Sequence, residues 1–144
     1  MGLLSGKTAL IVGIASKKSI AYGIAKSFHE QGAKLAFTYQ NEKLKGRVEG
    51  FAEEFGSDLV YPCDVAIDEE INNLKNNLCE QWPSLDILVH SVGYAPANEL
   101  EGDMVDVSTR EGFQIAHDIS SYSLIALTSA FKDHLSESAS VLTL

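Results

Sequence analysis

The residues best placed to do chemistry lie in one stretch near the amino terminus, from Gly13 to Gly23. The stretch follows an apolar run over residues 8–12, typical of a buried strand, and leads into apolar residues at helical spacing from Ile20 onward. A glycine after a strand permits a sharp turn and lets a ligand approach the main chain. The start of a helix offers unpaired N–H groups and the positive end of its dipole. Strand, loop and helix in this order therefore predict a site for a pyrophosphate.

Ser19 is the expected N-cap of this helix, and its hydroxyl could reach the same phosphate. Gly13 and Gly23 do not form the three clustered glycines of the usual dinucleotide-binding fingerprint, so the pattern alone is a weak signal. A glycine-rich turn that binds no ligand is the alternative interpretation. Gly23 falls inside the helix, where glycine costs about 1 kcal/mol relative to alanine, and close packing against the sheet would explain it.

Gln40 follows a second predicted strand, residues 34–39, at the place where a dinucleotide fold meets the adenosine ribose. Many such sites carry a carboxylate there, but a carboxamide can also hydrogen-bond a hydroxyl. Lys43 and Lys45 could pair with a 2′-phosphate, whereas no arginine lies beside them. The sequence therefore favours NADH over NADPH.

Asp64 follows a short predicted strand at residues 59–61. Its carboxylate could accept from the amino group of an adenine, while the N–H of Val65 donates to a ring nitrogen. The alternative is that Asp64 only begins a turn.

Ser91, Val92 and Gly93 follow a fourth predicted strand at residues 85–90, where the strand order of a doubly wound sheet reverses. Their main chain could line the ribose on the nicotinamide side, and Ala95 could face the substrate. An ordinary turn after a strand is again the alternative.

The remaining segments complete an alternation of strand and helix. Apolar spacing predicts helices over residues 44–56 and 71–82, a long helix that a capping box at 108–111 opens and that reaches about residue 132, and a fifth strand at 139–144. Such alternation predicts an α/β protein of one domain, residues 1–144, with a doubly wound parallel sheet of Rossmann type and helices on both faces.

Composition excludes several classes of function. The net charge of −9 argues against binding to a nucleic-acid backbone. The two cysteines, Cys63 and Cys79, lack the CxxC spacing, which favours reduced thiols in a cytoplasmic protein. Four scattered histidines predict no metal site. No apolar run reaches membrane-spanning length and no signal peptide precedes the first strand, so we expect no membrane association.

Five segments together resemble the bacterial NADH-dependent enoyl-acyl-carrier-protein reductases, a divergent branch of the short-chain dehydrogenase/reductase superfamily. They are Gly-Ile-Ala-Ser-Lys-Lys-Ser-Ile-Ala-Tyr-Gly from Gly13, Ala-Phe-Thr-Tyr-Gln-Asn from Ala36, Cys-Asp-Val-Ala from Cys63, His-Ser-Val-Gly-Tyr-Ala-Pro from His90, and Ala-His-Asp-Ile-Ser-Ser-Tyr-Ser from Ala116. The match is collinear along all 144 residues and covers little more than half of a complete family member.

The resemblance implies NADH as the cofactor and assigns contacts residue by residue. The implied contacts are Gly13, Ser19 and Ile20 on the pyrophosphate side, Gln40 at the adenosine ribose, Asp64 and Val65 at adenine, Ser91, Val92 and Gly93 along the nicotinamide half, and Ala95 at the acyl substrate. Val92 and Tyr94 stand where family members commonly carry isoleucine and phenylalanine. The hydroxyl of Tyr94 would alter the rim of the pocket.

The catalytic residues that the resemblance implies are two tyrosines and a lysine, all beyond Leu144. Two Tyr-x-x-x-Lys pairs occur here, at Tyr22–Lys26 and Tyr39–Lys43, but both belong to the adenosine half. We therefore expect no catalytic residue in this chain and no turnover by the chain alone. We also expect the chain to be the amino-terminal portion of a longer single-domain enzyme, with the fifth strand left as an exposed edge.

For the complete protein, the resemblance implies reduction of a trans-2-enoyl-acyl-carrier-protein thioester in bacterial type II fatty-acid synthesis, by a homotetramer. Hydride would pass from the nicotinamide to the β-carbon, and a tyrosine hydroxyl would stabilise the enolate oxyanion. Two alternatives stay open. One is another short-chain dehydrogenase or ketoreductase, and the other is a nucleotide-binding fragment without catalysis.

Overall fold

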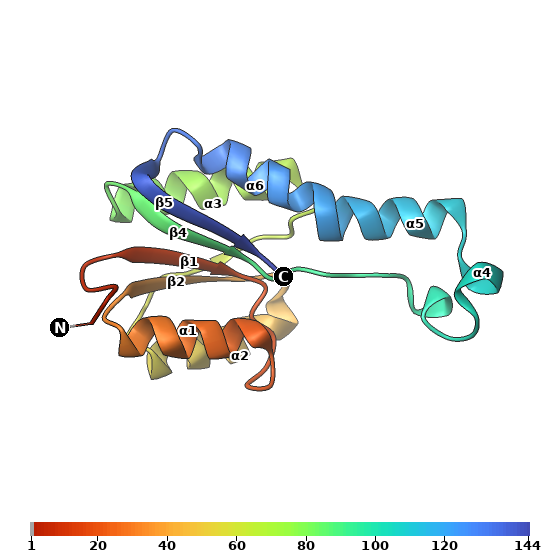
Figure 1. The fold of residues 1–144 in the computed structure, drawn as a ribbon, viewed down its shortest axis with the longest axis horizontal. Coiled ribbons are helices and arrows are strands. Elements are labelled where there is room, and N and C mark those ends of the chain that lie inside the picture. The colour runs from red at the N-terminus through yellow and green to blue at the C-terminus, as the bar shows by residue number, and fades with distance from the viewer. Residues whose placement is uncertain (1) are drawn as a thin grey trace.

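The computed structural model describes residues 2–144 around a five-stranded sheet in the order β3-β2-β1-β4-β5 (Figure 1). All four neighbouring pairs run parallel, which confirms the prediction of a doubly wound sheet of Rossmann type. The strands are β1 (Thr8–Val12), β2 (Lys34–Tyr39), β3 (Val60–Pro62), β4 (Leu85–His90) and β5 (Leu135–Thr143).

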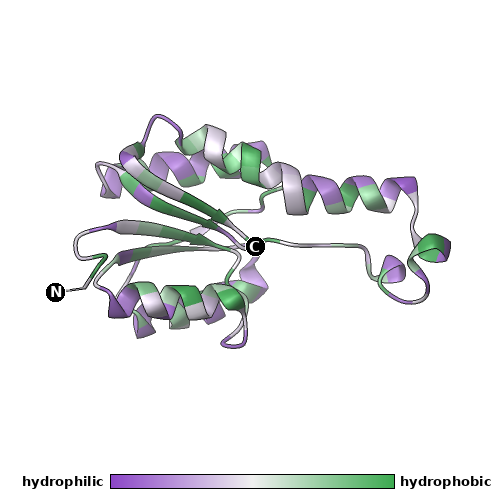
Figure 2. Cartoon of the chain, viewed as in Figure 1, coloured by the Kyte–Doolittle hydropathy of each residue, from purple (hydrophilic) through white to green (hydrophobic). Residues whose placement is uncertain are grey.

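Helices cover both faces of this sheet (Figure 1). On one face lie α1 (Ile20–Glu30) and α2 (Glu42–Glu54), and on the other lie α3 (Asp68–Gln81) and α6 (Ser123–Phe131). All five residues of β1 are buried, because a central parallel strand has an apolar layer on each side. Figure 2 shows the resulting concentration of hydrophobic residues along the strands.

An arm of short helices extends from one end of this body (Figure 1). After β4 the chain runs out through η1 (Ala97–Glu99) and α4 (Met104–Val107), and it returns through α5 (Arg110–His117). A π-helical segment, η2 (Asp118–Tyr122), then joins α5 to α6. The single long helix predicted from residue 108 to about 132 is therefore divided into three segments, although it ends close to the expected residue.

The N-cap of α5 differs from the predicted capping box by one residue. Thr109, not Ser108, is the cap, and its Oγ1 accepts from the N–H of Gly112 at 3.0 Å. The N–H of Thr109 donates at 3.0 Å to Glu99, in place of the predicted Glu111. A carboxylate brought from η1 thus completes the pattern that the sequence assigned to a local pair.

Other boundaries follow the sequence with small shifts. Ser19 caps α1 as predicted, and Gly32 and Gly56, both at positive φ, follow the ends of α1 and α2. β3 starts one residue later than predicted. β5 starts at Leu135 rather than at residue 139, because Leu135 already pairs with Leu85, and a register irregularity separates this pair from the regular pairing that begins at Ser140.

Gly23 contradicts the expectation of close packing. A Cβ added there would meet no atom within 4 Å, apart from its own helix and chain neighbours. The sequence therefore carries a helix-destabilising residue that no contact among residues 2–144 explains.

At the amino edge of the sheet, Asp86 ties three strands together. Its carboxylate accepts hydrogen bonds from the N–H of Thr8 at 3.0 Å, the hydroxyl of Ser136 at 2.8 Å and the ammonium of Lys7 at 3.3 Å. Burial alone would raise the pKa of Asp86, but these donors together hold it below its usual value. The charged form of Asp86 thus stabilises the fold.

Candidate functional site

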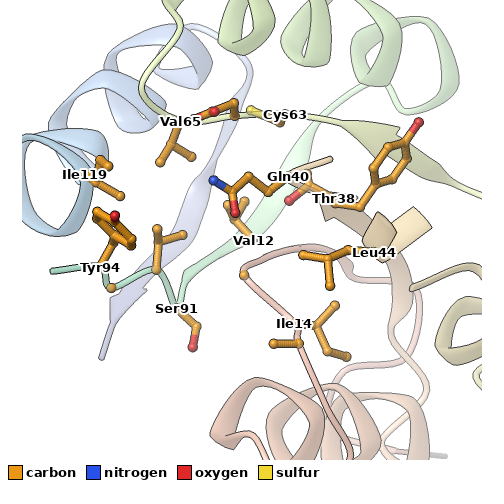
Figure 3. Close-up of a pocket in the computed structure, with 16 residues that line it drawn as sticks. Val12, Ile14, Thr38, Gln40, Leu44, Cys63, Val65, Ser91, Tyr94 and Ile119 are labelled. Atoms are coloured by element: carbon orange, nitrogen blue, oxygen red, sulfur yellow. The ribbon is translucent and has the colours of Figure 1, made fainter. Parts of the chain in front are cut away.

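A cavity of about 180 Å³ opens at the carboxyl edge of the sheet, between the ends of the first four strands. The strand order reverses at β1, which has β2 on one side and β4 on the other, and open α/β sheets bind ligands at such a reversal. Figure 3 shows side chains from these strand ends and from Ile119 of η2 around this space. The lining residues are Val12, Gly13, Ile14, Ala15, Thr38, Tyr39, Gln40, Leu44, Cys63, Asp64, Val65, Ser91, Val92, Gly93, Tyr94 and Ile119.

Most of the site residues predicted from the sequence meet at this cavity. Those that line it are Gly13, Gln40, Asp64, Val65, Ser91, Val92 and Gly93. Ser19, Ile20 and Ala95 do not line it. Ser19 and Ile20 stand at the start of α1, a few residues beyond the lining loop, and Ala95 directly follows the lining residue Tyr94.

Gly13 brings the ends of β1 and β4 together. Its φ is +102°, and a Cβ at this residue would lie 1.9 Å from the carbonyl oxygen of Ser91. The N–H of Ser91 donates to the carbonyl of Val12 at 2.8 Å, so the two segments stay in contact at the ends of β1 and β4. The sequence attributed this glycine to a turn and a ligand; the structure adds a neighbouring main chain that leaves no space for a side chain.

The start of α1 presents main-chain donors. The hydroxyl of Ser19 donates to the carbonyl of Ser16 at 2.6 Å and accepts from the N–H of Tyr22 at 3.2 Å. Its hydrogen is therefore already used within the loop. The N–H groups of Ile20 and Ala21 have no acceptor among residues 2–144. These free N–H groups, together with the helix dipole, can receive an anion.

Side chains of α2 hold the loop before α1 in place. Arg47 donates to the carbonyl of Ala15 at 3.2 Å, and Lys17 forms an exposed ion pair with Glu54 at 3.0 Å. The hydroxyl of Tyr22 donates to Glu54 at 2.6 Å, and this bond, together with Lys17, lowers the pKa of Glu54. The Tyr-x-x-x-Lys pair that begins at Tyr22 thus has its hydroxyl directed to α2 and not to the cavity.

At the end of β2, the side chain of Gln40 extends into the cavity (Figure 3). After β3, the Oδ1 of Asp64 accepts from the N–H of Ala66 at 3.0 Å. Asp64 therefore begins a turn, which was its alternative interpretation. This does not exclude a ligand, since Asp64 also lines the cavity and its second carboxylate oxygen is not used by that turn. The N–H of Val65 has no acceptor within the described chain.

Cys63 supplies an apolar part of the wall. Its side chain is buried, and burial together with the nearby carboxylates of Glu70 and Asp64 raises the pKa of this thiol to about 12. Cys63 therefore stays protonated at neutral pH and acts neither as a nucleophile nor as a charged ligand.

On the opposite side, the half-exposed Tyr94 lies beside Ile119 (Figure 3). The hydroxyl of Ser120 accepts from the N–H of Tyr94 at 2.9 Å and donates to its carbonyl at 3.1 Å. The main chain of Tyr94 is thereby fixed to η2.

Sequence reasoning missed several lining residues. Ile14 follows Gly13 and Thr38 lies two residues before Gln40, and proximity to a strand end is a signal that could have found them. Leu44 was assigned only to the apolar face of a helix. Ile119 falls inside the single long helix that the sequence predicts, and nothing in its spacing indicates the cavity.

Two searches address other kinds of function. No three His, Cys, Asp or Glu side chains within residues 2–144 are grouped so that they could hold a metal ion. In the same part of the chain, no helix combines the length and the apolar character needed to cross a membrane.

Comparison with known proteins was made for sequence and for structure. A family profile described as Enoyl-(Acyl carrier protein) reductase matches residues 13–144. Enoyl-[acyl-carrier-protein] reductase [NADH] FabI of Escherichia coli (strain K12) is 56% identical over 144 residues, which are 100% of this chain and 55% of that protein. FabI of Aquifex aeolicus (strain VF5) is 64% identical over 128 residues, 89% of this chain and 47% of its own length.

Solved structures give the same result. The crystal structure of the enoyl-[acyl-carrier-protein] reductase (NADH) of Aquifex aeolicus VF5 matches with a TM-score of 0.95 and 57% identity, covering 99% of this chain and 56% of that one. The reductase of Anaplasma phagocytophilum, in complex with NAD, matches with a TM-score of 0.93 and 40% identity, covering 99% and 54%. The chain thus spans about half the length of the relatives it matches.

Proposed function

This chain belongs to the enoyl-(acyl carrier protein) reductase family, and on that premise we propose that its residues form the NADH-binding portion of a bacterial enoyl reductase. The complete enzyme would reduce a trans-2-enoyl-acyl-carrier-protein thioester in type II fatty-acid synthesis. The observation that carries this proposal is the convergence of Gly13, Gln40, Asp64 and Gly93, from four strand ends, on one crevice where the strand order reverses.

The residues of the crevice fit a dinucleotide. The free N–H groups of Ile20 and Ala21 suit a pyrophosphate, and the side chain of Gln40 suits the hydroxyls of the adenosine ribose. Asp64 and the N–H of Val65 offer an acceptor and a donor, the two kinds of group that would bind an adenine edge. No metal is needed by any of these contacts.

The other half of the crevice would hold the nicotinamide. The main chain from Ser91 to Gly93 would line its ribose, Val92 would contact the ring, and Ala95 would face the acyl substrate. Bound NADH supplies a hydride for the β-carbon of an enoyl thioester. The residues in this chain bind and orient the cofactor; the groups that stabilise the enolate oxyanion are, by the family resemblance, beyond Leu144.

The adenosine side favours NADH over NADPH. Arg47 donates to the carbonyl of Ala15, and the ammonium of Lys45 lies 6.0 Å from the ring centre of Tyr39. Arg47 is thus engaged with the main chain, Lys45 lies over a ring and Gln40 adds no charge, which leaves the exposed Lys43 as the one of these cations that could pair with a 2′-phosphate. Titration with each cofactor tests this preference: tighter binding of NADPH would contradict it.

A pair of glycine variants tests the cofactor site by calorimetry. Gly93 lines the cavity, and a Cβ added there meets no atom within 4 Å, so Gly93→Val should fold and still obstruct the ligand. Gly50 on α2 is equally open but does not line the cavity, which makes Gly50→Val the matched control. We expect NADH affinity to fall roughly tenfold or more for Gly93→Val only. Equal affinities in the two variants would contradict the site, and a wild-type chain that binds no NADH would contradict the function.

The properties of the whole protein form the rest of the proposal. We expect it to be a cytoplasmic homotetramer whose partner is an acyl-carrier-protein thioester, and we expect the 144-residue chain to bind NADH without turnover. The intact mass of the native polypeptide, measured alongside NADH oxidation with a crotonyl thioester, tests this. Turnover by a polypeptide of 15.6 kDa would contradict the assignment of catalysis to residues outside this chain.

A further inference from the structure

The π-helical segment η2 carries contacts that cofactor binding through the strand ends does not use. Turns of π-helix are rare; they occur mostly as single turns inside α-helices, frequently at functional sites. In an α-helix the N–H of Ser123 would donate to the carbonyl of Ile119. Here it donates to the carbonyl of Asp118, one residue earlier, so the carbonyl of Ile119 lacks this donor. The carbonyl of Ile119 accepts from the hydroxyl of Ser123 at 2.6 Å.

Ser123 also ties this turn to the sheet. Its Oγ lies 2.7 Å from Nε2 of His90, the last residue of β4, which is completely buried. Because the hydroxyl hydrogen of Ser123 goes to Ile119, Nε2 carries the imidazole hydrogen and donates to Ser123. Nδ1 then accepts from the hydroxyl of Thr143 at 2.9 Å. The turn is therefore fixed to the ends of β4 and β5.

Ser120 extends this rigid unit to the loop after β4. Its single hydroxyl accepts from the N–H of Tyr94 and donates to the carbonyl of the same residue, at 2.9 and 3.1 Å. The segment from Ser91 to Pro96 has no regular secondary structure. The two hydrogen bonds from Ser120 thus satisfy both main-chain groups of a loop residue that lines the cavity.

We propose that Ser120 is a positioning residue for the nicotinamide half of the site, which it shapes by holding the Tyr94 main chain opposite Ile119. This inference rests on the proposed cofactor function. Figure 3 shows the side chains of Tyr94 and Ile119 next to each other at the cavity, and both are placed by residues of η2. Within this turn, Ile119 lines the cavity and the next residue, Ser120, bonds the loop.

Two ligands separate this role from a general structural one. NADH would occupy both halves of the crevice, whereas ADP lacks the nicotinamide and its ribose and would use only the adenosine half and the pyrophosphate site. Calorimetry on Ser120→Ala should show NADH affinity lowered roughly tenfold and ADP affinity unchanged. Ser120→Thr keeps the hydroxyl and should retain most of the NADH affinity. Ser121→Ala, at the exposed neighbouring serine, is the matched control and should behave as wild type.

Amide hydrogen exchange reads the contact directly. Protection of the Tyr94 N–H should fall roughly tenfold in Ser120→Ala and stay unchanged in Ser121→Ala. Equal losses of NADH and ADP affinity, or no loss of either, would overturn the positioning role while leaving the cofactor site intact. A wild-type chain that binds neither ligand would overturn the proposed function and this inference with it.

Discussion

Replacing Gly13 by alanine should destabilise the protein by roughly 3–5 kcal/mol, the range that marks a specific structural conflict. The left-handed conformation at φ +102° costs a residue with a Cβ about 1–2 kcal/mol. The new Cβ would also lie 1.9 Å from the carbonyl oxygen of Ser91, which must move by roughly 1.5 Å to reach an ordinary contact. That movement strains the bond from Ser91 to the carbonyl of Val12, worth about 0.5–1.5 kcal/mol.

Gly23→Ala is the matched control for this prediction. Gly23 lies inside α1 with open space at its Cβ position, so alanine there should stabilise the protein by about 0.5–1 kcal/mol. Urea denaturation followed by circular dichroism measures both changes through the midpoint concentration. A Gly13→Ala variant within 1 kcal/mol of wild type, or two variants destabilised alike, would refute the close approach of the two strand ends.

Three further predictions follow from single groups. Iodoacetamide at pH 8 should modify Cys79 of the native protein, because this thiol is partly exposed. It should not modify Cys63, whose pKa of about 12 keeps the thiol protonated. Rapid modification of both cysteines without denaturant would contradict this. The pKa of Asp86 is lowered in the fold, so its contribution to the free energy of unfolding should be complete above the pKa of about 4 that it has in the unfolded chain, and should be lost as the pH falls further. Asp86→Asn should therefore make the free energy of unfolding less dependent on pH in acid. An unchanged dependence would count against this role of Asp86. Thr109→Ala should reduce stability by about 1 kcal/mol and Ser108→Ala by much less, as thermal unfolding can show, and the reverse order would favour the capping box predicted from sequence.

The sheet and much of the crevice could be predicted from sequence because their signals are local. Apolar runs mark the buried strands, and Gly13, Gln40, Asp64 and Gly93 each lie within three residues of the end of one. In a doubly wound sheet the residues after parallel strands meet at one edge, so position along the chain suffices to bring them together. The cavity lining agrees with this reasoning.

Features set by distant partners could not be predicted. The N-cap of α5 is completed by Glu99, ten residues upstream of Thr109, and the π-helical segment is tied to His90 of β4 through Ser123. Neither partner is marked by spacing or propensity. Gly23 misled for the opposite reason, since its residue type suggested a contact that the fold does not make.

Backbone NMR of the 144-residue chain, titrated with NADH, tests the central claim most directly. The account predicts the largest shift changes at the amides of Ile20, Val65 and Gly93, which lie at the start of α1 and after β3 and β4. Changes confined to the amino edge of the sheet, near Asp86, or no changes at saturating cofactor, would contradict a dinucleotide site at the carboxyl edge.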